Sequence, residues 1–134
     1  MTWRAPLVGF CIGALLCAAA SVQAADANAL RAQAVVPGVW FVQGEAALGS
    51  SANRNFISNA AFVVTGDGVV VIDALGSPKL AEALIAEIRR VTPQPIRHVI
   101  VTHYHADHIY GLQAFKAAGA QIVAHHGGRD YLVH

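Results

Sequence analysis

The sequence predicts an α/β fold in which one sheet combines antiparallel and parallel strands. Three observations carry this prediction: short runs of Val, Ile and Phe between turn residues, one segment with helical periodicity, and a continuous apolar strand that ends in a histidine-rich stretch. The expected element order is β-β-β-α-β-α-β. No internal repeat, low-complexity run or linker divides it, so one domain is expected.

The first 24 residues differ from the rest of the chain. The sequence is 55% hydrophobic with a mean hydropathy of +0.47, and the excess lies in Ala5–Ala20, which follows Arg4. Val22 and Ala24 occupy the small-residue positions of a signal-peptidase site, so residues 1–24 are predicted to be a secretory signal peptide. The protein is therefore expected to be periplasmic or secreted. The alternative is a retained membrane anchor, but the apolar run is shorter than the roughly 18 residues that span a bilayer, so removal is favoured. No stable membrane association is expected after cleavage.

Charge and cysteine content exclude two kinds of protein. Cys11 and Cys17 both lie in the apolar segment, so cleavage would remove them and leave no disulfide framework. Loss of Arg4 would leave eight basic and eight acidic side chains. Such a balanced chain without a basic patch is not expected to bind nucleic acid.

The predicted domain begins after a short leader. Residues 25–35 are small and weakly patterned, and they are predicted to be a lead-in segment, mobile or briefly helical. The domain proper is expected over residues 36–134, with a first strand around Trp40–Val42, where β-branched and aromatic residues cluster. A loop is expected over residues 45–59.

The central part of the chain predicts a hairpin followed by a helix. Two apolar runs within residues 60–74 flank a TGDG turn, in which Asp67 and Gly68 can supply the positive backbone angles of a tight hairpin. Ser77 can then cap a helix that Pro78 starts. One face of this helix is apolar and should pack on the sheet; it carries Leu80, Leu84, Ile85 and Ile88. The charged residues of the helix lie largely on its other sides; they are Glu82, Glu87, Arg89 and Arg90.

The remaining elements surround the histidine stretch. Prolines in residues 92–96 end the helix, and residues 97–102 form a short apolar strand of the kind that is covered on both faces. Helical spacing of Leu112 and Phe115 follows, with Gly119 as a stop, before a last strand at residues 120–124. Residues 125–132 are expected to form a loop and the first turn of a helix.

The stretch VTHYHADHIYG carries the chemistry. In an extended loop, side chains alternate in direction, so His103, His105 and Asp107 would share one side, and His108 would turn back from the next helix. Imidazole nitrogens and a carboxylate oxygen are zinc ligands, and two subsets of this cluster suit a metal pair. Alone, each residue has an ordinary explanation, such as Asp107 capping the helix. Their combination at the end of a strand predicts a metal site.

This stretch resembles a known family motif. THYHADH, from Thr102 to His108, matches T-H-x-H-x-D-H of the metallo-β-lactamase superfamily, and VVVIDA, which ends at Asp73 and Ala74, resembles the strand and aspartate before that family's first long helix. Gly111 resembles the glycine after the motif. The similarity covers about residues 36–126.

The resemblance implies the N-terminal half of an αβ/βα sandwich with a two-metal site. His103 and His105 would bind one Zn²⁺, and Asp107 and His108 a second, with Fe as an alternative metal. Asp73 would support the metal loop by hydrogen bonding. Asp107 would also act in catalysis by orienting the metal-bound hydroxide that attacks a small-molecule substrate.

The resemblance also leaves ligands unassigned. The family takes a third histidine, a bridging aspartate or cysteine and a final histidine from later strands, so the domain is expected to be C-terminally incomplete and the 134-residue chain inactive alone. His125 and His126 are not expected to fill these positions, and His98 and His134 are expected at the surface or the core edge. Three functions stay open: a secreted zinc hydrolase, a glyoxalase II-like thioester hydrolase or iron persulfide dioxygenase, and a non-catalytic metal-binding domain.

Overall fold

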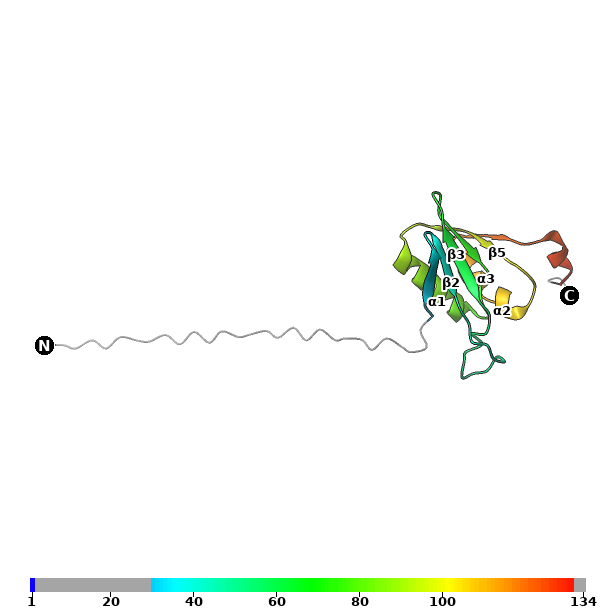
Figure 1. The fold of residues 1–134 in the computed structure, drawn as a ribbon, viewed down its shortest axis with the longest axis horizontal. Coiled ribbons are helices and arrows are strands. Elements are labelled where there is room, and N and C mark those ends of the chain that lie inside the picture. The colour runs from blue at the N-terminus through cyan, green and yellow to red at the C-terminus, as the bar shows by residue number, and fades with distance from the viewer. Residues whose placement is uncertain (2–29, 132–134) are drawn as a thin grey trace.

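One six-stranded sheet, with helices packed against it, forms the body of the molecule (Figure 1). The structure, a computed structural model, describes Met1 and residues 30–131. The strands follow one another across the sheet in chain order, antiparallel from β1 to β4 and parallel from β4 to β6. They are β1 Ala32–Val36, β2 Val39–Val42, β3 Ala60–Val64, β4 Val69–Ile72, β5 Ile96–Ile100 and β6 Gln121–Val123.

Within residues 30–131, three α-helices and one 3₁₀ helix complete the fold. They are α1 Pro78–Val91, α2 Ala106–Ile109, α3 Leu112–Ala117 and the 3₁₀ helix η1 His126–Tyr131. The α/β class predicted from the sequence is confirmed, and the helix expected after the histidine stretch is present as two short helices that meet at Gly111. The predicted signal peptide lies outside the described residues. Within the described part of the chain, none of the helices has the length and apolar character needed to cross a bilayer.

The first strand is the main departure from the expected elements. The sequence predicts that residues 32–35 lie in the lead-in segment, but they belong to β1, which pairs antiparallel with β2. Pro37 and Gly38 form the turn, and Gly38 adopts a φ of 80°. The Ala-rich strand is mostly exposed and has no amphipathic alternation, so pairing with β2 provides the order that its own sequence does not indicate.

The β3–β4 hairpin forms as predicted, with one difference in its turn. Gly68 adopts a φ of 137°, whereas the turn does not require a positive φ at Asp67. The Thr65 side chain takes part instead, because its hydroxyl accepts from the Asp67 N–H and donates to the Gly68 carbonyl, at 3.2 and 2.7 Å. The two apolar runs of this hairpin form the centre of the sheet.

Helix α1 covers one face of the sheet and builds the core. Ser77 caps it by accepting the Leu80 N–H at 3.2 Å, and Pro78 stands at its start, as the sequence predicts. The apolar side of α1 packs with the inward side chains of the strands and with Phe115 of α3. The largest fully buried side chains in this layer are Phe62, Phe115, Leu75, Leu84 and Ile88.

Glu87 is a buried acid on α1 that the sequence pattern places with the solvent-facing residues. It is 5% exposed, because it faces the start of β1. Its carboxylate accepts the Ala32 N–H at 2.9 Å and two bonds from the Arg90 guanidinium at 2.9 and 2.8 Å. The hydrogen bonds from Arg90 lower the pKa of Glu87, against the opposing effect of burial and with help from the Ala32 N–H. Glu87 therefore joins α1 to the first strand.

The opposite face of the sheet also carries apolar side chains. Phe41, Ala61, Ile72, Ile100 and Val123 are successive partners across five strands, so they form one row on a single face. Ile100 and Val123 are 40% and 45% exposed. Such a face suits packing against a second sheet, as in the sandwich that the sequence resemblance implies.

Candidate metal centre

The candidate site lies where two parallel strands end side by side. Asp73 follows β4 directly, and Thr102 and His103 follow β5 after Val101. Because β4 and β5 are parallel neighbours, the chain segments after them leave the same edge of the sheet. Helix α2 begins at Ala106 and completes the edge.

Asp73 organises this edge. It is 4% exposed, and its Oδ1 accepts the Thr102 N–H at 2.8 Å. Its Oδ2 accepts the Thr102 hydroxyl at 2.7 Å and lies 2.8 Å from His108 Nδ1. Asp73 and the buried Leu75 both have φ values of 64°, a strained conformation for Leu, so the turn after β4 is tightly determined by its surroundings.

The hydrogen-bond network assigns the tautomers of two histidines. A carboxylate only accepts, so His108 Nδ1 donates to Asp73, and in the neutral ring His108 Nε2 carries the lone pair. The Thr102 hydroxyl gives its proton to Asp73, so it accepts from His103 Nδ1 at 2.9 Å. In the neutral ring, His103 Nε2 therefore also carries the lone pair. Both rings are oriented as metal-binding histidines usually are, with the second nitrogen held by the protein.

The donor atoms fall into two pairs with separations that suit a metal. His103 Nε2 lies 3.2 Å from His105 Nδ1, and His108 Nε2 lies 3.5 Å from Asp107 Oδ2. Tetrahedral ligands about 2.0 to 2.1 Å from zinc stand about 3.3 to 3.4 Å apart. The rings of His103 and His108 are 4.0 Å apart between centroids, so the two pairs adjoin. The separation within each pair is therefore that of two ligands on one metal ion.

A second grouping of possible donors includes Asp73. Single ligand atoms of Asp73, His103 and His108 all lie within 4.8 Å of one another. Both oxygens of Asp73 are already bonded to Thr102 or His108, and the side chain is buried. We therefore interpret Asp73 as a residue that orients the candidate metal ligands. The candidate ligands themselves are the pair His103 and His105 and the pair Asp107 and His108.

Asp107 reaches the site from a helix and not from the extended loop that the sequence suggested. The extended segment ends at His105, and Asp107 and His108 occupy the first turn of α2. Asp107 does not cap this helix, because the cap residue is His105 and no side chain makes the cap bond. The helical turn brings Asp107 Oδ2 beside His108 Nε2.

Contacts with two other segments, around Ser58 and Ala74, hold residues 102–111 in place. The Ser58 hydroxyl donates to the main-chain carbonyl of Asp107, and the Ala74 N–H donates to the His108 carbonyl at 2.8 Å. Gly111 passes so close to the turn after β4 that a Cβ there would lie 1.9 Å from the Ala74 carbonyl oxygen. Sequence reasoning missed Ser58, which is 4% exposed and lies at the end of the expected 45–59 loop.

A comparison of the sequence with protein families decides the family. The model of the metallo-β-lactamase superfamily matches residues 53–133, more than half of the chain. The chain belongs to the metallo-β-lactamase superfamily.

Solved metallo-β-lactamases share this fold. One from Hirschia baltica aligns with a TM-score of 0.65 at 20% identity, over 78% of this chain and 47% of that one. One from Erythrobacter litoralis aligns with a TM-score of 0.60 at 23% identity, over 74% of this chain and 42% of that one. The part of these solved chains that aligns with this protein is therefore less than half of their length.

Curated relatives match shorter segments. A type 2 metallo-β-lactamase of Bacillus sp. (strain 170) is 36% identical over 62 residues, 46% of this chain and 24% of the relative. A linear primary-alkylsulfatase of Pseudomonas sp. (strain ATCC 19151) is 35% identical over 49 residues, 37% of this chain and 9% of the relative. The aligned segment thus spans about a quarter or less of these metallo-β-lactamase superfamily relatives.

The other histidines lie outside the paired donors of this metallo-β-lactamase domain. His125 shares the lining of a cavity of about 360 Å³ with His103 and Tyr104, and its ring contacts His126. Within residues 30–131, the group of donors that could hold one ion includes neither of them. His98 is half-buried in β5, and His134 lies outside the described residues.

Proposed function

We propose that the protein is an exported, zinc-dependent hydrolase of the metallo-β-lactamase superfamily. In this proposal His103 and His105 bind one zinc ion, and Asp107 and His108 bind a second. The two donor pairs, with separations of 3.2 and 3.5 Å, carry the proposal. The superfamily membership supports the reaction class.

The chain's own residues prepare this chemistry. Zinc, when bound, supplies Lewis acidity and lowers the pKa of a water molecule to about 7. Asp73 orients His108 by a direct hydrogen bond, and it orients His103 through the Thr102 hydroxyl. The Nε2 atoms of both rings are thereby directed at the site. Asp107 has one oxygen beside His108 Nε2, and its carboxylate is suited to orient the attacking water. Tyr104, 46% exposed, lines the cavity next to His103, and its exposure there supports a contact with a small-molecule substrate.

For the whole enzyme we also propose a class of substrate and further metal ligands. The similarity to a linear primary-alkylsulfatase and to type 2 metallo-β-lactamases supports hydrolysis of a small molecule, with a sulfate ester and a β-lactam as two substrates to test first. A catalytic zinc site holds three protein ligands and one open position, so each pair needs at least one more ligand. Export is supported by the signal-peptide pattern of residues 1–24.

Metal analysis joined to an activity screen tests the proposal. The longest product of the gene should be purified, its zinc and iron measured, and its hydrolysis of alkyl sulfates, β-lactams and thioesters assayed. We expect zinc and one hydrolytic activity that His103→Ala abolishes and that His126→Ala retains, because His126 is exposed and lies outside the donor pairs. Full activity of a metal-depleted His103→Ala protein would refute it. Iron with thioester or persulfide turnover would replace zinc hydrolysis with the alternative chemistry.

Export has a separate test. N-terminal sequencing of the mature protein from a fractionated cell should give a chain that begins at Ala25. A mature protein that keeps Met1 in the cytoplasmic fraction would contradict the proposed export.

A further inference from the structure

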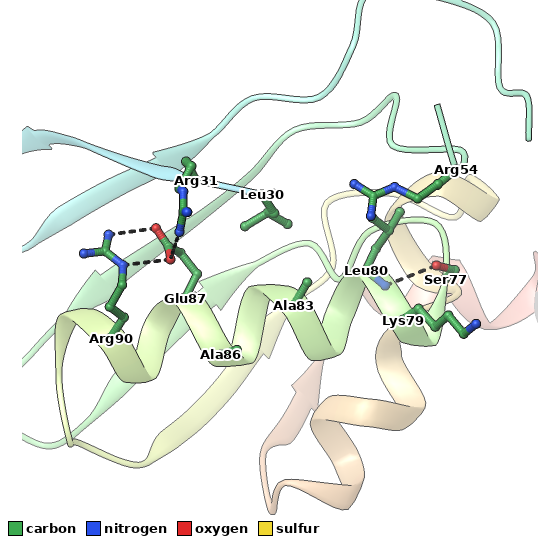
Figure 2. Close-up of a pocket in the computed structure, with 10 residues that line it drawn as sticks. All are labelled: Leu30, Arg31, Arg54, Ser77, Lys79, Leu80, Ala83, Ala86, Glu87 and Arg90. Carbon is green, nitrogen blue, oxygen red and sulfur yellow. Dashed lines mark hydrogen bonds and ion pairs between the residues drawn. The ribbon is translucent and has the colours of Figure 1, made fainter. Parts of the chain in front are cut away.

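A groove separate from the metal donors runs along α1 (Figure 2). It encloses about 660 Å³ and is lined on one side by α1 from Ser77 to Arg90. At 1.5 Å per residue, this stretch is about 20 Å long. The other side comes from Leu30 and Arg31, just before β1, and from Arg54 in the β2–β3 loop. The lining therefore extends along about 20 Å of helix, a length that suits an extended ligand.

The middle of the groove is apolar. Leu30 and Leu80 are 6% and 4% exposed and form its inner surface. Ala83 and Ala86 present short side chains from the exposed side of α1, where a helix usually carries charged residues. Figure 2 shows Leu30 and Ala83 between the charged groups at the two ends. A hydrocarbon chain along this surface would meet no charged group until it reached an end of the groove.

The charge of the groove is positive. Four cationic residues line it, Arg31, Arg54, Lys79 and Arg90, against a single acid, Glu87. The two bonds from Arg90 neutralise Glu87, and Arg31 lies 3.9 Å from the same carboxylate. The positive charge not committed to Glu87 thus lies at the opposite end, where Figure 2 shows Arg54 and Lys79 on either side of Leu80 and Ser77. Arg54 already has an interaction partner, so Lys79 is the main cation for a ligand.

We propose that this groove binds a linear amphiphilic anion, whose headgroup lies at Lys79 and whose hydrocarbon chain lies along Leu30, Ala83 and Ala86. A compact anion would use the charge and leave the apolar surface in water, whereas a neutral hydrocarbon would leave the charge without a partner. The proposed ligand is a soluble single-chain molecule, such as an alkyl carboxylate. This site is independent of the metal donors and of the proposed hydrolysis.

Chain length and headgroup charge give the first test. Isothermal titration calorimetry should be done on the full chain in a metal chelator, with octanoate, decanoate and the neutral decanol, each kept below the concentration at which it aggregates. We expect one saturable site, about tenfold tighter binding for each two added methylenes, and binding of decanol at least about fivefold weaker than that of decanoate. Equal affinities for octanoate and decanoate, or for decanol and decanoate, would overturn the proposal.

Two matched pairs of variants locate the ligand. Lys79→Glu should weaken decanoate binding about tenfold, and Lys116→Glu, the same change in α3, should leave it unaltered. Ala83→Glu should remove binding by placing a carboxylate in the groove, and Ala117→Glu, on an exposed position of α3, should not. Far-UV circular dichroism would show that each variant is folded. Equal binding by all four variants would overturn the proposal, as would binding to phosphatidylglycerol vesicles without binding to monomeric decanoate.

Discussion

Asp73 and Glu87 are two buried carboxylates that do different work. Both are about 95% buried, and each joins segments that are far apart in the sequence. Asp73 bonds to a hydroxyl, a main-chain N–H and an imidazole, and so sets the direction of two candidate ligands. Glu87 bonds to a guanidinium and to the first residue of β1. Asp73 therefore orients the side chains of the candidate metal site, and Glu87 holds the edge strand β1 against α1.

The tightest contact on the Asp73 side is at Gly111, where we expect the largest effect on stability. Gly111→Ala would place a Cβ 1.9 Å from the Ala74 carbonyl oxygen and 2.7 Å from Ala81 Cβ, so the backbone must move. We expect a loss of about 3 kcal/mol or more in the free energy of unfolding, measured by urea denaturation. The control is Gly66→Ala, where the added atom meets nothing within 4 Å. Equal stability of the two variants would contradict the close packing.

Asp73→Asn should affect both stability and metal binding. An amide cannot accept from Thr102 and His108 as a carboxylate does, so the histidines lose their orientation. We expect about 2 kcal/mol lower stability and a 10- to 100-fold loss in zinc affinity, measured in competition with a chromophoric chelator. Unchanged zinc affinity in a folded Asp73→Asn protein would show that Asp73 does not position the ligands.

Glu87→Gln should lower stability without changing zinc affinity. We expect a loss of about 1 to 2 kcal/mol at pH 7, because the bonds from Arg90 and Ala32 lose their charged acceptor. The pKa of Glu87 is lowered in the folded state, so the stability from its ionised form is present above its unfolded pKa of about 4.3 and is lost as the pH falls through the folded pKa.

Urea denaturation at several pH values checks the direction of this pH dependence of stability. The difference in stability between the wild type and Glu87→Gln should be largest at neutral pH and should shrink below about pH 4. Glu82→Gln, an exposed position on the same helix, is the control and should show little difference at any pH. A Glu87 difference that grew on acidification would contradict the role of the ionised carboxylate.

Ser58→Ala should have the smallest effect. The variant removes the hydroxyl that donates to the Asp107 carbonyl and leaves that acceptor unsatisfied. We expect about 1 kcal/mol lower stability and a small loss of zinc affinity, whereas Ser58→Thr should retain most of both. A Ser58→Thr protein as impaired as Ser58→Ala would point to packing and not to the hydroxyl.

The sequence marks the candidate donors more clearly than the contacts that support them, and the reason is distance along the chain. His103, His105, Asp107 and His108 lie within six positions after an apolar strand, so alternation and helix geometry are enough to bring them together. Ser58 acts on a carbonyl 49 residues away, and no local pattern marks it. The spacing of residues in the sequence therefore indicates which side chains lie together within one helix, strand or loop. It does not indicate which side chains meet between elements that are far apart in the sequence.

Strand β1 and Glu87 show the same limit in the fold. The strand is short, Ala-rich and mostly exposed, so neither propensity nor periodicity indicates it. Glu87 is buried because Ala32, 55 residues earlier, places a main-chain N–H against it. The β3–β4 hairpin and α1 were predicted because their turn residues, cap and apolar periodicity are local.

Metal binding by the paired donors is the central claim, and cobalt titration of the full chain tests it most directly. Co²⁺ absorption reports ligand type and coordination, so binding can be followed without any assay of activity. We expect wild-type protein and His126→Ala to bind Co²⁺ equally, and His103→Ala and His105→Ala to lose at least about tenfold in affinity. Binding that is the same in all four proteins would contradict the proposed metal centre.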